Sequence, residues 1–136
     1  MAKIFEYKMK VRDYECDAQG VVNNANYLHY FEATRHEMME GCGLRLRDLT
    51  EENIIPVVRN ANISYRSSLR GSEEFISTVR VEREGLRFFF IQEITRIPDN
   101  TLCAKAEIEV VCLIDGKVSK PDMFDKAFAD YLTWRK

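Results

Sequence analysis

Long apolar runs, clustered cysteines and an excess of basic residues are all missing from this chain of 136 residues. No apolar run approaches the roughly 18–20 residues that a membrane-spanning helix needs. The N-terminal stretch MAKIFEYKMK lacks the apolar segment of a secretion signal. We therefore expect no membrane span and a cytoplasmic location.

Metal and nucleotide motifs are missing as well. The four cysteines include no Cys-x-x-Cys pair, and His29 and His36 are the two histidines. We therefore expect free thiols in a reducing compartment and no metal site. The sequence has no Walker loop, no Gly-x-Gly-x-x-Gly, no Gly-x-Ser-x-Gly and no His-Glu-x-x-His, which removes the commonest nucleotide, serine-hydrolase and zinc-peptidase hypotheses. No cofactor is predicted.

The charge balance argues against nucleic acid as a partner. The chain has 20 Lys and Arg against 22 Asp and Glu, a net charge of −2, whereas nucleic-acid-binding proteins usually carry a basic excess. Hydrophobic residues make up 46% of the sequence, with 6 Gly and 3 Pro, so the chain can bury a substantial core. Its length suits one domain, which we assign to residues 1–136.

The hydrophobic pattern predicts one strand, a long helix and then four strands. Alternation with a period of two predicts the first strand over Ile4–Arg12, and an apolar stretch without Gly or Pro predicts a helix over Ala25–Glu40. Shorter helices are expected over Leu44–Leu49 and Asp122–Trp134. Four further strands are predicted, separated by turn signals: Ile55–Arg66, Glu74–Glu84, Leu86–Ile97 and Leu102–Ile114.

This order of elements predicts an α+β fold in which a curved antiparallel five-stranded sheet wraps around one long central helix. Short connections favour antiparallel pairing of consecutive strands. The apolar positions expected on the helix include Ala25, Leu28 and Phe31, a face too wide for one sheet to cover. Pairing of sheet edges between two copies would cover the rest, so we expect a homodimer or homotetramer.

The segment before the long helix has the composition of a small catalytic loop. Asp17 stands seven residues before the predicted helix start near Asn24, and Gly20 between them permits a tight turn. The first amides of a helix have no intrahelical acceptor, so they can stabilise a developing oxyanion. A neighbouring carboxylate can act as a nucleophile or general base, and the two groups together suit acyl transfer. Asp-x-x-Gly is also an ordinary turn, and Asn23 or Asn24 an ordinary N-cap.

The run Asp17-Ala-Gln-Gly-Val-Val-Asn-Asn-Ala-Asn-Tyr-Leu, followed by Phe31-Glu32 and Arg35, resembles the hot-dog-fold acyl-CoA thioesterases of the 4-hydroxybenzoyl-CoA thioesterase type, including the Tol-Pal-associated group. The segment from Ile63 to Phe75 also resembles that family. The resemblance implies a hot-dog fold, a site at a subunit interface and hydrolysis of a thioester to free acid and coenzyme A.

Site residues follow from the same resemblance. Asp17 matches the catalytic carboxylate, and the backbone N–H of Asn24 matches the donor that polarises the thioester carbonyl. Gly20, Val22 and Ala25, in the same motif, are predicted to contact substrate. Relatives often carry Tyr or His at positions 23 and 24, where this chain has Asn, so a phenol or imidazole role is absent there.

Coenzyme A would need cations for its phosphates. Arg83 and Arg87 flank the Glu84-Gly85 turn, where relatives hold the nucleotide, and are the predicted substrate-binding cations. The alternative is that both are surface residues at strand ends. On the long helix, spacing predicts that Glu32, Arg35 and His36 form a surface network. The Phe88-Phe89-Phe90 run is predicted to lie in the core and at an interface.

Three alternatives stay open at this point. An acyl-acyl carrier protein thioesterase would share the chemistry, with protein contacts in place of the nucleotide site. A non-catalytic acyl-thioester-binding protein would share the fold. A hot-dog dehydratase is less favoured, because no His followed by Phe-Pro-Gly stands at the helix entrance.

Overall fold

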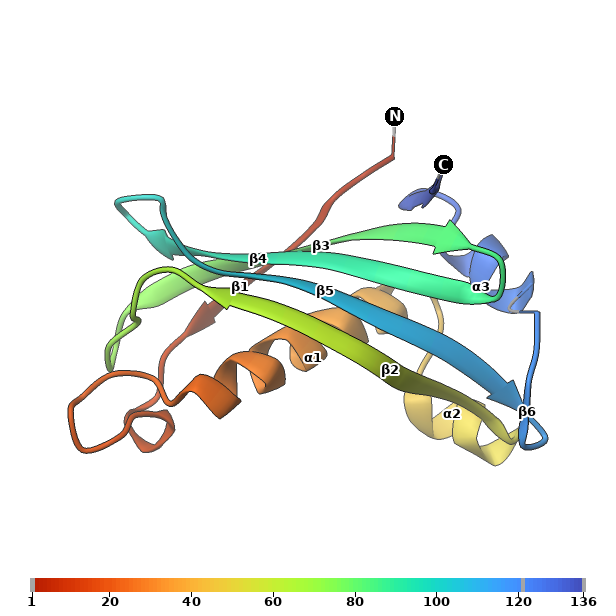
Figure 1. Ribbon diagram of the computed structural model, residues 1–136, viewed down its shortest axis with the longest axis horizontal. Coiled ribbons are helices and arrows are strands. Elements are labelled where there is room, and N and C mark those ends of the chain that lie inside the picture. Colours follow the sequence, from red (N-terminus) through yellow and green to blue (C-terminus); the bar gives the residue numbers. More distant parts are fainter. Residues whose placement is uncertain (1, 121, 136) are drawn as a thin grey trace.

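The computed structural model describes residues 2–120 and 122–135 and shows one curved sheet wrapped around a long helix (Figure 1). The predicted α+β, hot-dog arrangement is confirmed. The elements, besides a short 3-10 turn over Asp13–Glu15, are β1 (Phe5–Lys10), α1 (Asn24–Gly41), α2 (Leu46–Glu51), β2 (Ile54–Tyr65), β3 (Glu74–Glu84), β4 (Arg87–Ile97), β5 (Thr101–Ile114), β6 (Lys117–Val118), α3 (Asp122–Ala127) and β7 (Leu132–Trp134).

The sheet has the order β1-β3-β4-β5-β2, with β6 beside β5 and β7 beside β3. The five long strands pair antiparallel, as expected, whereas the short β7 runs parallel to β3. Burial alternates along β1 and β3, which confirms the period-two prediction for these strands.

The expected pairing of consecutive strands is wrong for β2 and β3. β2 pairs with β5 instead, from Ile54 opposite Ile114 to Tyr65 opposite Ala104. The pairing with β5 continues just past the end of β2, where the Arg66 N–H donates to the Cys103 carbonyl over 2.8 Å. The connection that follows crosses to β3, which places β2 at one end of the strand order.

Helix α1 lies across the concave side of the sheet (Figure 1). It buries seven residues at helical spacing against the core: Tyr27, Tyr30, Phe31, Thr34, Arg35, Met38 and Met39. The expectation that Ala25 and Leu28 belong to the covered face is wrong, since both are exposed, Leu28 by 42%. Tyr27, between them in the chain, is buried, so Ala25 and Leu28 lie on the part of the helix surface that the sheet does not cover.

The C-terminal segment differs from the helix predicted over Asp122–Trp134. The helix ends at Ala127, and Leu132–Trp134 forms β7. Phe124 and Phe128 are buried and anchor the segment. The Phe128 carbonyl accepts from the N–H groups of Tyr131 and Leu132, which turns the chain toward β3. An apolar pattern this short is compatible with a helix or a strand. Here it forms a strand, because β3 has an edge beyond its pairing with β1 to which it can hydrogen-bond.

Among the described residues, none of the helices combines the length and the apolar character needed to cross a bilayer.

Candidate active site

The loop before α1 is closed on itself by backbone hydrogen bonds. The Asp17 N–H donates to the Val21 carbonyl over 2.9 Å, and the Gly20 N–H donates to the Asp17 carbonyl over 3.0 Å. Gly20 has φ +79°, a conformation that glycine adopts without strain. The turn predicted around Gly20 is therefore present, and it gives Asp17 a defined place.

Asp17 presents its carboxylate at the surface of this loop. Its Oδ1 accepts from the Gln19 N–H over 2.9 Å, a common Asx turn. Among the described residues, Oδ2 has no hydrogen-bond or ion-pair partner. One oxygen thus fixes the orientation of the side chain and the other is free to react.

A buried acid, Glu15, holds the loop to the helix. Its Oε1 accepts from the Tyr30 hydroxyl and from the Arg12 N–H, each over 2.8 Å, and its carbonyl accepts from the Asn26 Nδ2 over 2.7 Å. Burial, and then the Glu15 hydrogen bond and charge, raise the pKa of Tyr30, so the phenol stays a proton donor. Sequence reasoning missed Glu15, because nothing in the chain spacing marks its pairing with a residue fifteen positions away.

The start of α1 leaves its first backbone donor without an acceptor among the described residues. Asn23 is the N-cap, and its Oδ1 accepts from the Ala25 N–H over 2.9 Å. The Asn26 N–H donates to the Asn23 carbonyl. Within the part of the chain that the structure describes, the Asn24 N–H has no acceptor. A free amide at a helix N-terminus, where the helix dipole is positive, is suited to an oxyanion.

A groove of about 270 Å³ opens beside this amide. Its walls are Val22, Asn24, Tyr27, Tyr65, Arg66, Ser67 and Ser68. The Tyr65 hydroxyl donates to the Asn24 carbonyl over 3.2 Å and so ties the end of β2 to the helix start. Val22 and Asn24 were predicted from the sequence, whereas the β2 end was not. Asp17, Gly20 and Ala25 lie outside the lining of this groove.

Arg83 does not lie at the surface as a strand-end residue would. It is 5% exposed, pairs with Asp125 and packs over the Trp134 ring, with 4.9 Å from Cζ to the ring centroid. Its Nε–H donates to the Gly85 carbonyl over 3.1 Å. Through these contacts the Arg83 guanidinium joins α3 to β3.

Arg87 is more accessible. Its side chain is 38% exposed and pairs with Glu84, and its NH1 lies 3.6 Å from the Glu109 Oε1. The β3–β4 turn that carries it lies beside α3, at the opposite end of the molecule from the loop before α1 (Figure 1). The chain therefore does not bring the two arginines to Asp17 and Asn24.

The histidines and cysteines show no catalytic grouping. His29 is exposed, and the four cysteines are free. Within residues 2–120 and 122–135, no group of three or more His, Cys, Asp or Glu side chains could hold a metal ion.

Known proteins similar to this chain agree on one family. Residues 11–132 match the model of the thioesterase-like superfamily. The chain is 31% identical to the chloroplastic acyl-acyl carrier protein thioesterase ATL3 of Arabidopsis thaliana, over 97% of this chain and 71% of the relative. It is 30% identical to the acyl-CoA thioester hydrolase YbgC of Escherichia coli, over 91% of this chain and 92% of the relative.

Solved structures show the same fold. The 1,4-dihydroxy-2-naphthoyl-CoA thioesterase Slr0204 from Synechocystis superimposes with a TM-score of 0.87 at 19% identity, covering 94% of this chain and 97% of that one. With the match over residues 11–132, the expectation of a thioester hydrolase is confirmed at the level of the family. This chain belongs to the thioesterase-like superfamily.

Proposed function

We propose that this protein hydrolyses acyl-CoA thioesters, with Asp17 as nucleophile or general base and the Asn24 amide as the donor to the carbonyl oxygen. One observation carries the proposal: the Asn24 N–H at the start of α1 has no acceptor among the described residues, and the preceding closed loop presents a carboxylate oxygen without a partner.

Two routes suit these groups, and both consume one water. In the first, Asp17 attacks the thioester carbon, the C–S bond breaks, and water hydrolyses the resulting mixed anhydride to acid and regenerated carboxylate. In the second, Asp17 takes a proton from water as the water oxygen attacks the carbonyl carbon, the C–S bond breaks, and the proton on Asp17 passes to the departing sulfur, which leaves as the thiol. In both, negative charge develops on the carbonyl oxygen, where the Asn24 amide stabilises it.

The carrier of the acyl group has to be argued separately, because one relative named above is an acyl-acyl carrier protein thioesterase and the other an acyl-CoA thioester hydrolase. Arg87 favours coenzyme A, because a partly exposed guanidinium is suited to a phosphate. Both arginines have carboxylate partners that a phosphate would have to displace, and Arg83 is the weaker candidate because its side chain is 6% exposed against 38% for Arg87. A carrier-protein substrate is the alternative, and it predicts rates that fall with salt as the acidic carrier is screened.

The proposal is tested by steady-state hydrolysis of aliphatic and aromatic acyl-CoAs, with the released thiol as readout. We expect turnover of at least one acyl-CoA, and Arg87→Ala should raise KM with kcat nearly unchanged. A remote phosphate contact holds the ground state and the transition state alike. The matched control is Arg47→Ala, an exposed arginine on α2, which should leave KM unchanged.

Unchanged KM in Arg87→Ala, together with faster turnover of acyl-acyl carrier protein, would favour the carrier-protein alternative. Binding of both thioesters without turnover of either would favour the non-catalytic protein. Either result would contradict the proposal.

We also infer that the active enzyme is a homo-oligomer that pairs through the edge of β2. Among the described strands β2 pairs with β5 alone, which leaves its other edge open over twelve residues. Three large apolar side chains on it are exposed by 40–49%: Ile55, Val58 and Tyr65. Open apolar edges attract a second strand. A second copy could also supply the cations that lie far from Asp17 in a single chain.

Sedimentation at micromolar protein should therefore show a species of at least twice the 15.9 kDa chain mass. Val58→Lys, which places a charge on the open strand, should shift the population toward monomer and lower activity with it. Val118→Lys is the control, because Val118 is equally exposed, by 50%, but lies on β6. A wild-type monomer would contradict an interfacial site.

A reducing compartment suits the four free cysteines, which supports the expected cytoplasmic location.

A further inference from the structure

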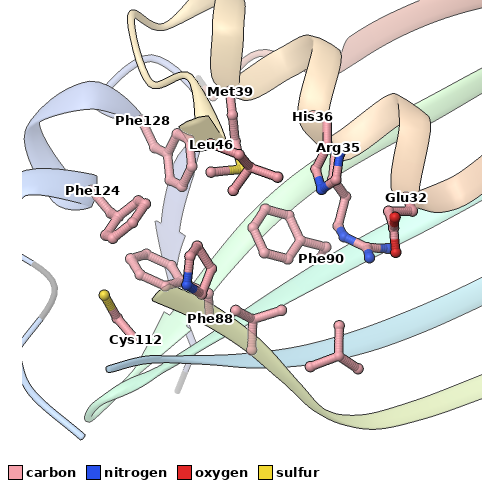
Figure 2. A pocket seen from close by; sticks show the side chains of 13 residues that line it. Glu32, Arg35, His36, Met39, Leu46, Phe88, Phe90, Cys112, Phe124 and Phe128 are labelled. Atoms are coloured by element: carbon pink, nitrogen blue, oxygen red, sulfur yellow. The ribbon is translucent and has the colours of Figure 1, made fainter. Parts of the chain in front are cut away.

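A second cavity lies between the helices and the concave side of the sheet, and sequence reasoning missed it. It measures about 270 Å³ and is walled by residues of α1, α2, β2, β4, β5 and the α3 segment. Its two ends differ in chemistry. Figure 2 shows the rings of Phe88, Phe124 and Phe128 at one end, and Arg35 with Glu32 at the other. The Phe88-Phe89-Phe90 run is buried, which confirms the core part of its prediction, while its interface part stays a prediction. Phe88 and Phe90 also line this cavity.

Arg35 is the unusual residue of the wall. The surface network expected for Glu32, Arg35 and His36 is wrong at this residue, because Arg35 is 7% exposed. Its NH1 donates to the Gln92 Oε1 over 3.0 Å, and the Gln92 Nε2 donates to the Phe31 carbonyl over 3.0 Å. Gln92 is fully buried and therefore holds the guanidinium in one place.

Arg35 forms no salt bridge among the described residues, since none of their carboxylate oxygens lies within 4 Å of its guanidinium. Glu32, three residues earlier on α1, is exposed, and its charge raises the pKa of Arg35 from beyond that distance. Two further titratable groups lie on the wall. His36 is half-buried and has a pKa lowered by that burial, and Cys112 has a pKa raised by burial. Burial lowers the pKa of Arg35 to about 10, which leaves it charged at neutral pH. A buried cation is costly unless an anion meets it.

We propose that this cavity binds a small molecule with an apolar body and one terminal carboxylate, with the carboxylate on Arg35 and the body against the phenylalanine rings. Among the described residues, the donors of Arg35 other than NH1 have no protein acceptor, so they are suited to a carboxylate. The volume is just below the roughly 300–1,000 Å³ typical of small-molecule sites, which favours a small occupant. The site goes beyond the proposed hydrolysis, since it uses neither Asp17 nor Asn24.

Two sources could supply such a carboxylate. One is a free carboxylic acid, the product class of thioester hydrolysis. The other is the far end of a substrate acyl group that carries a second carboxylate, an assignment that rests on the proposed function. Helix geometry separates the sites within one chain: Arg35 lies eleven residues beyond Asn24, about 16 Å along α1.

Calorimetric titration tests the site directly, with octanoate and 3-phenylpropanoate as probes and the matching primary alcohols as neutral controls. We expect the wild-type protein to bind at least one acid about tenfold or more tightly than its alcohol, because a hydrogen bond to a charged partner replaces a neutral one. Equal affinity for acid and alcohol, or no binding of any probe, would overturn the proposal.

Variants assign the effect to Arg35. Arg35→Gln should abolish the preference for the acid, while Arg47→Gln, an exposed arginine outside the cavity, should keep it. Glu32→Gln should bind the acid as well as or better than wild type, because it removes a competing carboxylate, and a loss there would contradict a site in which Arg35 meets the ligand carboxylate. If Arg35→Gln does not fold, Leu46→Trp fills the cavity from α2 and should exclude acid and alcohol together.

The two sources are distinguished by kinetics. If the carboxylate belongs to the substrate, kcat/KM should be about tenfold higher for an acyl-CoA with a terminal carboxylate than for its methyl ester, and Arg35→Gln should remove that ratio. If it belongs to a free acid, the ratio stays near one while the titration still shows binding. Asp17→Asn should retain acid binding in either case, so that a failure of the hydrolytic proposal leaves this one testable.

Discussion

Replacing Asp17 with asparagine should lower kcat for acyl-CoA hydrolysis by about 10²–10⁴-fold, and by more if Asp17 is a nucleophile. The amide keeps the size of the side chain and an oxygen that can accept from the Gln19 N–H. It loses both the nucleophilic oxygen and the base. Binding of a non-hydrolysable acyl-CoA analogue should survive, because the helix amide and the groove are untouched. Turnover at a near wild-type rate would make Asp17 an ordinary turn residue.

The partner of Asp17 can be tested at Asn24 with a matched pair. Asn24→Ala keeps the backbone N–H and should be mild. Asn24→Pro removes that N–H alone, at the first helical position, where proline is favoured. Asn23 before it has φ −62° and ψ 137°, a conformation that a following proline accepts. Removing one oxyanion donor costs about 10²–10³ in kcat, so Asn24→Pro should be slow and still folded. Equal rates in both variants would exclude the amide from the reaction.

Asp125→Ala should lower the free energy of unfolding by about 3 kcal/mol. Its partner Arg83 has a side chain 6% exposed and would be left buried without a counter-charge. The estimate is at the low end for a broken buried pair, because the Asp125 side chain keeps 24% exposure. Urea denaturation at fixed protein concentration measures the change.

Asp130→Ala is the matched control for that measurement. Asp130 pairs with Lys3 at 3.9 Å, and both side chains are about 70% exposed. Exposed pairs contribute at most about 1 kcal/mol, so this variant should unfold close to wild type. Equal loss in the two variants would mean that Arg83 does not depend on Asp125.

Local signals were sufficient where structure depends on neighbours in the chain. The helix predicted over 25–40 forms over Asn24–Gly41, and the strand predicted over 74–84 has those bounds. The turn around Gly20 was also predictable, because its φ of +79° favours glycine. Leu28 was misplaced, because helical spacing gives the faces of a helix but not how far the sheet covers each one.

The candidate site divides in the same way. Asp17, Val22 and Asn24 come from a short run of residues whose spacing and resemblance predicted their place. Tyr65 and Glu15 did not, since each reaches α1 across the fold. Arg83 was predicted to bind substrate or to be a surface residue at a strand end. Its burial depends on Asp125, forty-two residues later, which no local pattern reveals.

The order of the long helix and the five long strands, the closed loop and the free amide were predictable from the sequence, because each follows from hydrogen bonds and apolar spacing within a few residues. Tertiary structure alone decided that β2 pairs with β5, that residues 132–134 extend the sheet and that Arg35 faces a cavity. These outcomes depend on which surfaces meet after the sheet has curved around α1. Such contacts join residues distant in the chain, and periodicity carries no information about them.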